Sequence, residues 1–243
     1  MILPFEDRMQ DDSALGSMAP ARRFSGSSMA DLQNDVERRH QAKADACRML
    51  SACYYEPEEA FLDEDVFGQL ERALSALDAE CAAQAQAMGR CFRETGCEEL
   101  RIDYTRLFLG PFNIRSKPYG SVYLDRGNVV MGATTMAVLA LYREGGFMVA
   151  EEFTEMPDHV AVELEFLYLL NARLGDGHTE SNERNRLAGL ERSLLEEHLG
   201  KWIVPFTEAM KEGSRTEFYQ KLADLTRRFV LDALRQPGRA PLP

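Results

Sequence analysis

Apolar residues recur three and four positions apart over most of the chain, the spacing that places them on one face of an α-helix. In the first such stretch, residues 35–55, the spacing is kept by Val36, Ala44, Cys47, Leu50 and Tyr54. Similar stripes predict helices over residues 63–77, 78–92, 98–109, 132–144, 180–199, 202–211 and 215–234. No useful period-two alternation and no repeat of roughly 20–50 residues accompanies them. The pattern predicts an all-α fold: one globular domain of about eight to ten helices.

Three segments depart from this pattern and set the domain boundaries. Residues 1–36 lack apolar periodicity, so we expect a disordered N-terminal tail. The helical domain then covers residues 37–235, and the Pro- and Gly-rich residues 236–243 are expected to form a flexible tail. Inside the domain, residues 111–130 carry prolines, glycines and three aromatic residues, which predicts a long central loop. Loops of this length inside a compact helical domain are often functional.

The most apolar stretch, Val160 to Leu170, contains two charged residues, Glu163 and Glu165. A helix that is apolar almost all round is a buried helix, so its polar residues need an explanation. At helical spacing, Asp158 shares a side with Glu165, and His159 shares a neighbouring side with Glu163. Two interpretations stay open. Asp158 is a helix cap and His159 a core histidine bonded to Glu163, or these groups form a ligand-binding corner.

Charge favours a cationic partner for that region. Seven acidic residues and no lysine or arginine lie between Glu144 and Ala172, and such a field attracts positive charge. The whole chain has a net charge of −12, which argues against a nucleic-acid partner and permits a basic peptide. No apolar run reaches the roughly 18 residues of a transmembrane helix, so we expect no stable membrane insertion.

The cysteines and the first residues bear on the compartment. Five cysteines occur, an odd number without a C-x-x-C pair, which is typical of reduced thiols and indicates a cytoplasmic protein. Arg22-Arg23-Phe24 has the form in which many export signals begin, but no apolar segment follows it. We therefore reject an export signal.

Motifs of common enzyme classes are missing from the sequence. It contains no glycine-rich phosphate loop, no Gly-x-Ser-x-Gly element and no Glu-x-x-His pair of a di-iron bundle. We therefore expect no catalytic residue, no metal site and no cofactor. The alternative is a helical enzyme, or a carrier of a cofactor or nucleotide, that uses the Asp158/His159 corner for acid–base chemistry or binding.

Four motifs occur in a fixed order along the chain. They are Tyr104-Thr-Arg-Leu-Phe108-Leu-Gly110-Pro111, Pro118-Tyr-Gly120-Ser121-Val-Tyr123-Leu-Asp125, Glu155-Met-Pro157-Asp158-His159 and His198-Leu-Gly-Lys-Trp202. Together they resemble the TorD/DmsD/NarJ family of cytoplasmic molybdoenzyme maturation chaperones, over most of residues 40–235. Met156 departs from the family, because many members have Pro or Glu there, and the N-terminal tail has no counterpart.

The resemblance implies a TorD-like helical fold and a non-enzymatic role. Such proteins bind the twin-arginine signal peptide, and often the body, of a molybdenum oxidoreductase catalytic subunit until molybdopterin is inserted and folding is complete. The family motifs linked to peptide binding correspond here to Pro157, Asp158, His159, Gly120, Ser121 and Tyr123. Long loops between the helices allow either a monomer or a domain-swapped dimer.

The charge pattern and the resemblance together suggest how a signal peptide would bind. Its arginines would meet an acidic rim formed by Glu151, Glu152, Glu155 and Asp158. Its apolar part would lie in a groove lined by the helix of Tyr104 and Phe108 and by the loop that carries Pro118, Tyr119 and Tyr123. Packing of these aromatic side chains in the core is the alternative.

Overall fold

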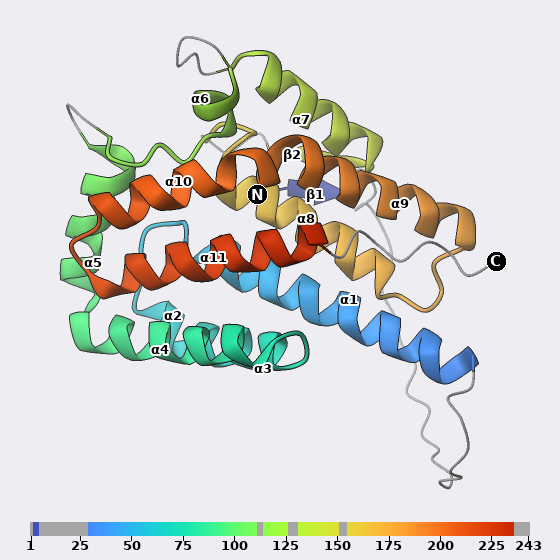
Figure 1. Ribbon diagram of the computed structural model, residues 1–243, viewed down its shortest axis with the longest axis horizontal. Coiled ribbons are helices and arrows are strands. Elements are labelled where there is room, and N and C mark those ends of the chain that lie inside the picture. Colours follow the sequence, from blue (N-terminus) through green and yellow to red (C-terminus); the bar gives the residue numbers. More distant parts are fainter. Residues whose placement is uncertain (1, 5–28, 111–113, 126–130, 151–154, 236–243) are drawn as a thin grey trace, which may run out of the picture.

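The computed structural model describes residues 2–4, 29–110, 114–125, 131–150 and 155–235, and these residues are almost entirely helical (Figure 1). Two helices far apart in sequence form the centre. They are α1 (Met29–Ala52) and α8 (Val160–Leu174), which pack along each other. The predicted all-helical fold is confirmed, and every helix in this described part is too short or too polar to reach across a bilayer.

The first half of the chain builds one side of the bundle. After α1 come α2 (Ala60–Asp63), α3 (Val66–Ser75), α4 (Ala79–Thr95), α5 (Cys97–Tyr104) and the π-helical turn η1 (Thr105–Leu109). Asp78 starts α4 as its cap, because its Oδ1 accepts from the backbone N–H of Cys81 at 2.8 Å. The predicted helix over residues 63–77 is instead divided at Asp65, which has a positive φ of 52°.

The middle of the chain crosses the top of the molecule in Figure 1. It contains α6 (Gly120–Leu124), α7 (Ala133–Glu144) and β2 (Phe147–Val149), which pairs antiparallel with β1 (Ile2–Pro4). As predicted, α7 stops at Gly145-Gly146, and Gly146 has the positive φ of 79° that glycine tolerates best. This segment carries several of the residues discussed below.

The last part of the chain packs back on the centre. It consists of α9 (Ser181–Ser193), the π-helical segment η2 (Leu194–Leu199), α10 (Gly200–Gly213) and α11 (Glu217–Arg235). Asp103 of α5 joins α11 to the first half, because its Oδ2 accepts from the backbone N–H groups of Arg215 and Thr216, both at 2.8 Å. A buried carboxylate with several donors fixes the start of α11.

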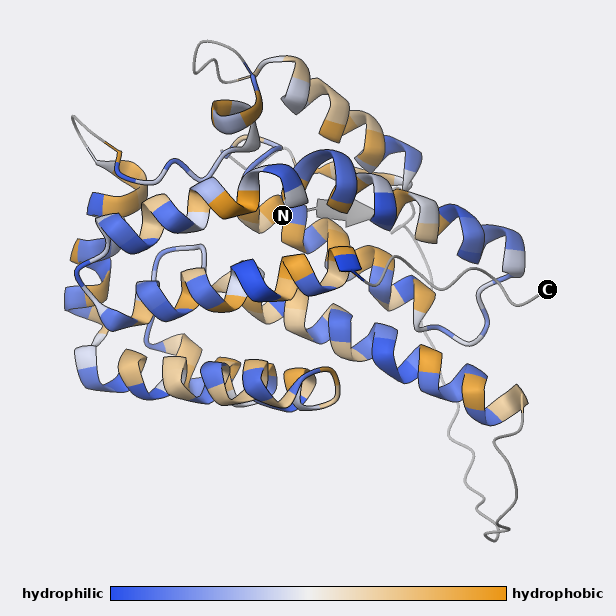
Figure 2. Cartoon of the chain, viewed as in Figure 1, coloured by the Kyte–Doolittle hydropathy of each residue, from blue (hydrophilic) through white to orange (hydrophobic). Residues whose placement is uncertain are grey.

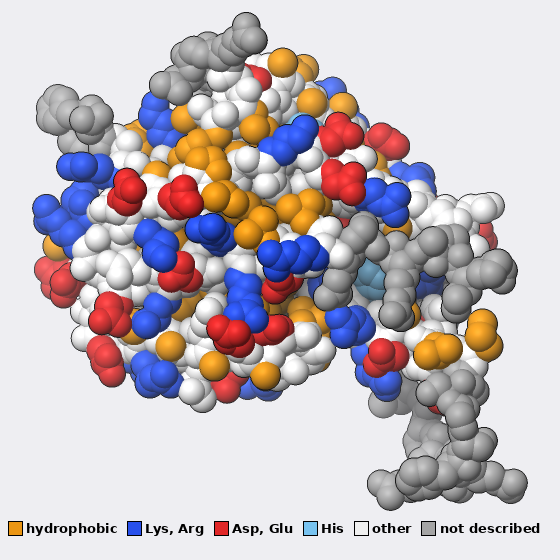
Figure 3. All heavy atoms as spheres, in the orientation of Figure 1, with side chains coloured by type: hydrophobic (Ala, Val, Ile, Leu, Met, Phe, Trp, Pro, Cys, Tyr) orange, Lys and Arg blue, Asp and Glu red, His pale blue; other side chains and the backbone are white. Residues whose placement is uncertain are grey.

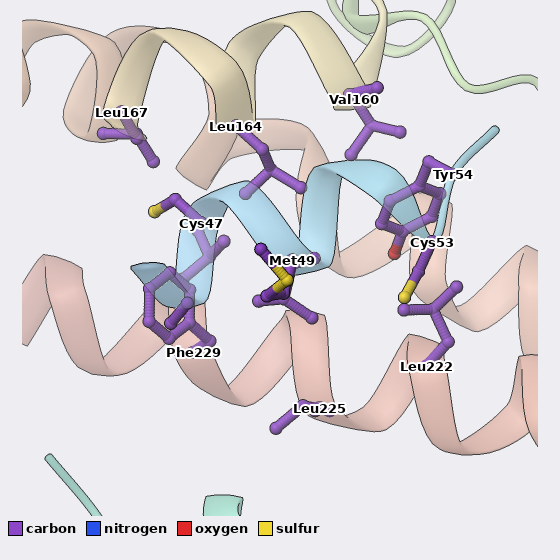
Figure 4. Packing of buried hydrophobic residues seen from close by; sticks show 14 of the residues in the cluster. Cys47, Met49, Cys53, Tyr54, Val160, Leu164, Leu167, Leu222, Leu225 and Phe229 are labelled. Atoms are coloured by element: carbon purple, nitrogen blue, oxygen red, sulfur yellow. The ribbon is translucent and has the colours of Figure 1, made fainter. Parts of the chain in front are cut away.

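The core lies where α1, α8 and α11 meet (Figure 4). Its side chains are buried and come from all three helices: Cys47, Met49, Cys53, Tyr54, Val160, Leu164, Leu167, Leu222, Leu225 and Phe229. The buried hydroxyl of Tyr54 donates to Thr226 Oγ1 at 2.9 Å, so this polar group is satisfied. Figure 2 shows the consequence for α1 and α11, on which polar residues alternate with apolar ones around each helix.

Two sequence predictions about the segments outside the long helices need correction. Residues 2–4 form a strand and α1 already begins at Met29, so parts of the predicted tail over residues 1–36 are in regular structure. The predicted loop over residues 111–130 contains the short helix α6. The other described residues of this loop, 114–119 and 125, lie directly before and after α6. Backbone pairing explains the first case, because β1 gains its partner from β2 rather than from local sequence. The predicted tail over residues 236–243 lies outside the described residues.

Gly200 was predicted to break a helix, and instead the helix continues through it. Gly200 has helical angles, with φ −66° and ψ −22°. A Cβ at this position would lie 2.2 Å from the carbonyl oxygen of Leu195, a distance no side chain tolerates. The lack of a side chain at Gly200 therefore lets η2 continue directly into α10, and the helix does not end there.

All five cysteines are free and buried. Burial raises the pKa of Cys53 and of Cys81 to about 12. Because the thiolate is the reactive form, we expect the native protein at pH 8 to react with Ellman's reagent at least about tenfold more slowly than a free thiol. The unfolded chain should release five equivalents at once. Rapid labelling of more than one thiol in the folded protein would contradict the burial of this set.

Candidate functional site

Two segments separated by almost forty residues are joined by backbone hydrogen bonds. Gly120 N donates to the carbonyl oxygen of Asp158 at 2.9 Å, and Val160 N donates to that of Pro118, also at 2.9 Å. Between these bonds Tyr119 and His159 form an isolated antiparallel bridge. The structure thus brings together the two central motifs identified in the sequence.

Asp158 lies under the start of α6. Its side chain is fully buried, and Oδ2 accepts from the backbone N–H of Ser121 at 2.7 Å. Its other oxygen, Oδ1, has no hydrogen-bond partner among the described residues. One of the two interpretations of the sequence made Asp158 the cap of the buried helix that follows it. Instead it stabilises α6, whose free N–H groups need an acceptor.

Glu163 is a second fully buried carboxylate beside Asp158. Trp202 Nε1 donates to its Oε2 at 3.4 Å, and Oε1 has no partner among the described side chains. Burial, reinforced by the negative charge of Asp158, raises the pKa of Glu163 well above its ordinary value. Burial therefore favours the protonated form of Glu163. Gly120 packs against this pair, since a Cβ there would lie 2.9 Å from Trp202 Nε1 and 3.3 Å from Glu163 Oε1.

His159 is held as a neutral acceptor. It is 4% exposed, and its Nδ1 accepts from the backbone N–H of Ala161 at 3.1 Å, which caps α8. Burial lowers the pKa of His159 to about 3. The side-chain bond to Glu163 that one interpretation expected is not among the hydrogen bonds of the described residues; Glu163 N instead donates to the carbonyl oxygen of His159 at 3.0 Å. Its ring instead packs against those of Tyr55 and Tyr119, at centroid distances of 6.4 and 5.3 Å.

Partly exposed acids and tyrosines surround this buried centre. Tyr119 Oη donates to Glu155 Oε2 at 2.5 Å, and Tyr55 Oη donates to Glu165 Oε1 at 2.8 Å. We call these four residues the rim. Burial, together with Glu155, raises the pKa of Tyr119, so this hydroxyl stays a donor at neutral pH.

A hollow of about 290 Å³ opens beside the rim, along the seam between α1 and α8. It is lined by Arg48, Ser51, Ala52, Tyr55, Glu165, Tyr168 and Leu169. The guanidinium of Arg48 donates to Gln69 of α3 at 3.2 Å, so it is held at one edge. The hollow thus combines a carboxylate with aromatic and aliphatic walls.

Several predicted groove residues pack in the interior. Tyr104 and Phe108 are buried, with their rings 5.2 Å apart, and Phe108 also contacts Tyr219 at 5.8 Å. The predicted groove along their helix is therefore wrong for this conformation, because both rings are used by the core. Pro157 is partly exposed, and its carbonyl oxygen accepts from Tyr142 Oη at 2.9 Å. Its role is to position the chain ahead of Asp158.

The acidic rim also differs from the prediction. Glu155 lies at the surface, but Asp158 is sealed inside, because its oxygen serves α6. Glu151 and Glu152 lie outside the described residues. On the face shown in Figure 3, acidic and basic side chains are interspersed, so the net charge of −12 is not gathered there. Glu165, which was predicted to lie beside Asp158, belongs to the rim through Tyr55.

Two further residues belong to the buried centre and were not predicted to do so. Trp202 is fully buried and stacks on Tyr123 at 5.7 Å with 17° between the rings. His198 is 6% exposed, faces the charge of Asp158, and its Nδ1 has no partner among the described residues. The feature of the sequence that could have identified them is that both belong to the fourth motif. No group of histidine, cysteine, aspartate or glutamate side chains in the described part is arranged to hold a metal ion.

Comparison with known proteins gives consistent results. The family model for the nitrate reductase delta subunit matches residues 74–208, more than half of the chain. The Tat proofreading chaperone DmsD of Salmonella typhimurium is 33% identical over 189 residues, covering 74% of this chain and 83% of its own. The chaperone protein TorD of Photobacterium profundum is 28% identical over 142 residues, covering 58% and 65%.

A third relative carries a different name. The perchlorate reductase assembly chaperone protein of Dechloromonas aromatica is 29% identical over 132 residues, covering 53% of this chain and 58% of its own. The resemblance seen in the four motifs is therefore confirmed, and the chain belongs to the nitrate reductase delta subunit family, which is the TorD/DmsD/NarJ group.

Proposed function

We propose that this protein is a cytoplasmic chaperone for a molybdenum oxidoreductase. It binds the twin-arginine signal peptide of the catalytic subunit, holds the subunit during folding and cofactor insertion, and delays export until both are complete. Relatives named as a Tat proofreading chaperone and as a reductase assembly chaperone support this role. The protein needs no catalytic residue for it, and either a monomer or a domain-swapped dimer could perform it.

The observation that best supports a location for the peptide-binding site is the rim with the hollow beside it. Glu155 and Glu165 are held by tyrosine hydroxyls, so their carboxylates are already oriented before a ligand arrives. A guanidinium forms its strongest hydrogen bonds with carboxylates, often two at a time. An arginine of a signal peptide would bind this pair of acids, both of which lie close enough to Tyr55 to raise its pKa.

The apolar part of the same peptide fits the hollow. Tyr55, Tyr168 and Leu169 offer aromatic and aliphatic surface, and Ser51 supplies a hydroxyl. Ligand sites of this kind are mostly apolar, with few polar groups that fix orientation. An apolar side chain that follows the arginines would lie here, and the charged pair would set the register.

The alternative role, an enzyme or a cofactor carrier at Asp158 and His159, has less support. Both side chains are buried, with exposures of 0% and 4%. A substrate could not approach either group in this conformation. His159 also uses Nδ1, its acceptor atom, for the backbone of α8, so it lacks the free base that proton transfer needs.

Binding of a synthetic leader peptide tests the proposal. The peptide carries a pair of arginines followed by an apolar segment of roughly ten residues. We expect micromolar or tighter affinity by calorimetry, and weaker binding between about 0.01 and 1 M salt, because the Debye length falls from about 30 to about 3 Å. A peptide with glutamines in place of the arginines should bind at least about tenfold more weakly.

Matched variants locate the site. Glu155→Gln and Glu165→Gln should each weaken the affinity for the arginine peptide by about three- to tenfold, because one charge-assisted hydrogen bond becomes neutral. Glu212→Gln, an exposed acid at the far end of α10, is the control and should bind as the original protein does. Equal affinity for the arginine and glutamine peptides would refute the proposed function. Equal binding by all three variants would refute only the rim as the site.

A further inference from the structure

Several buried polar atoms of the centre lack a hydrogen-bond partner. Three oxygen atoms, Ser121 Oγ, Asp158 Oδ1 and Glu163 Oε1, are buried without a hydrogen-bond partner among the described residues. His198 Nδ1 is in the same state. The side chains come from α6, the segment before α8, α8 and η2, so four parts of the chain supply them. Leaving such groups unsatisfied costs about 1–3 kcal/mol each.

A guanidinium would satisfy this set better than other common ligands. It has five N–H donors in a plane and no acceptor, and it pairs with carboxylates. The buried centre offers two carboxyl groups and a hydroxyl, and the side-chain hydrogen bonds made to the carboxyl groups come from Ser121 N and, at 3.4 Å, from Trp202 Nε1. The composition of the centre therefore points to a cationic, planar, donor-rich group.

The short helix α6 covers these carboxylates. It has five residues and packs mainly against α7 and α10, while Gly120 at its start lies against Glu163 of α8. It is held by Gly120 N on the carbonyl of Asp158, by Ser121 N on the Asp158 side chain, and by Tyr123, which packs on the rings of Trp202 and Phe206. Its remaining residues, Val122 and Leu124, are only partly buried. These contacts, to the segment around Asp158 and to α10, are the ones that must break if α6 moves away.

We propose that α6 is a lid over a second part of the peptide-binding site, and that its opening lets Asp158 and Glu163 bind the guanidinium of a client arginine. This inference rests on the proposed function, and it assigns one arginine to the rim and the other to the buried pair. Tight pairing of a client leader would thus require the lid to open.

Opening also has a consequence for protons. Burial beside Asp158 favours the protonated form of Glu163 in the closed state, and a guanidinium favours its ionised form. Binding should therefore release a proton. The other titratable groups around the pair are His159 before α8, Tyr142 of α7 and His198 of η2, which in turn feels the nearby charges of Lys201 and Glu197. Burial keeps both histidines neutral at pH 7, so Glu163 is the proton source.

Trp202 reports on the lid directly. It is the chain's single tryptophan, fully buried, with Tyr123 of α6 stacked on it. Addition of the arginine peptide should shift its emission to longer wavelength and increase quenching by acrylamide. Hydrogen exchange gives a second measurement that needs no variant. The amides of Gly120 and Ser121, which donate to Asp158, should lose protection when the peptide binds.

Calorimetry in buffers of different ionisation enthalpy measures the number of protons released on binding. The original protein should release up to one proton per bound arginine peptide at pH 7, and Glu163→Gln should release none and bind about tenfold more weakly. Glu212→Gln, the control, should match the original protein. If the peptide binds while the Trp202 emission, the exchange and the proton count stay unchanged, the lid is refuted and the proposed function stands. If no peptide binds, both are refuted.

Discussion

Replacing Trp202 by Ala is expected to destabilise the protein by about 3–5 kcal/mol, the range found when large aromatic side chains are removed from packed cores. Trp202 is fully buried, with its ring 5.2 Å from Phe206 and 5.7 Å from Tyr123. The substitution leaves a cavity and removes the indole donor of Glu163. It also removes the surface on which α6 rests.

Urea denaturation followed by far-ultraviolet circular dichroism measures the effect. The midpoint should fall markedly for Trp202→Ala and less for Trp202→Phe, because the phenyl ring retains much of the packing. Ile102→Ala is a suitable control, since that side chain is 60% exposed and its loss should change stability by no more than about 0.5 kcal/mol. An unchanged midpoint for Trp202→Ala would show that the α6–α10 contact carries little energy.

The helices were predictable because their signals are local. The stripe of residues 98–109 and its Gly110 stop correspond to α5 and η1, and the double glycine after Glu144 ends α7 as expected. The π-helical turns and the division at Asp65 have no such signal. They arise where neighbouring elements set the backbone, as at Gly200, where Leu234 of α11 packs so closely that a Cβ would lie 2.5 Å from its Cδ1.

The site was only partly predictable, and Asp158 shows why. Its predicted neighbour, Glu165, follows from counting 100° per residue, which holds only inside a helix. The helix α8 begins at Val160, so the direction of the Asp158 side chain is set by the segment that precedes it. Its actual partner, Ser121, lies 37 residues away in sequence. Helical periodicity carries no information about such a contact.

Glu163, Tyr104 and Phe108 likewise make contacts that local spacing in the sequence could not predict. The sequence marked Glu163 as unusual in an apolar helix, but its donor, Trp202, comes from a helix 39 residues later. The spacing of Tyr104 and Phe108 correctly placed both rings on one helical face. It could not decide whether that face meets the core or a ligand, and the ring of Tyr219 fills the space instead.

Opposite titrations in the site predict how stability depends on pH. The folded pKa of His159 is lowered to about 3 from 6.5, so below pH 6.5 the unfolded chain binds a proton that the folded one does not. Stability from this residue therefore falls as the pH decreases through that window. The folded pKa of Glu163 is raised from 4.5, so its contribution is present at low pH and is lost as the pH rises above 4.5.

Between pH 4.5 and 6.5 the two effects oppose each other, so the original protein should be most stable there. Each effect amounts to at most about 1.4 kcal/mol per pH unit. His159→Asn keeps a capping oxygen for Ala161 N but cannot titrate, so relative to the original protein it should gain stability at pH 4. Glu163→Gln should gain stability at pH 8, because its neutral amide has no proton to lose.

Urea denaturation at pH 4, 5.5 and 8 separates these effects, because the difference between a variant and the original protein isolates one group. His178→Asn provides the control, since its side chain is fully exposed and the substitution should change the free energy of unfolding by no more than about 0.5 kcal/mol at each pH. His40 and His198, whose pKa values burial also lowers, act in the same sense as His159 and cancel in these differences. Identical pH profiles for all variants would mean that neither buried group changes its proton on unfolding. The sealed centre would then be open to water, and a guanidinium could enter it without any movement of α6.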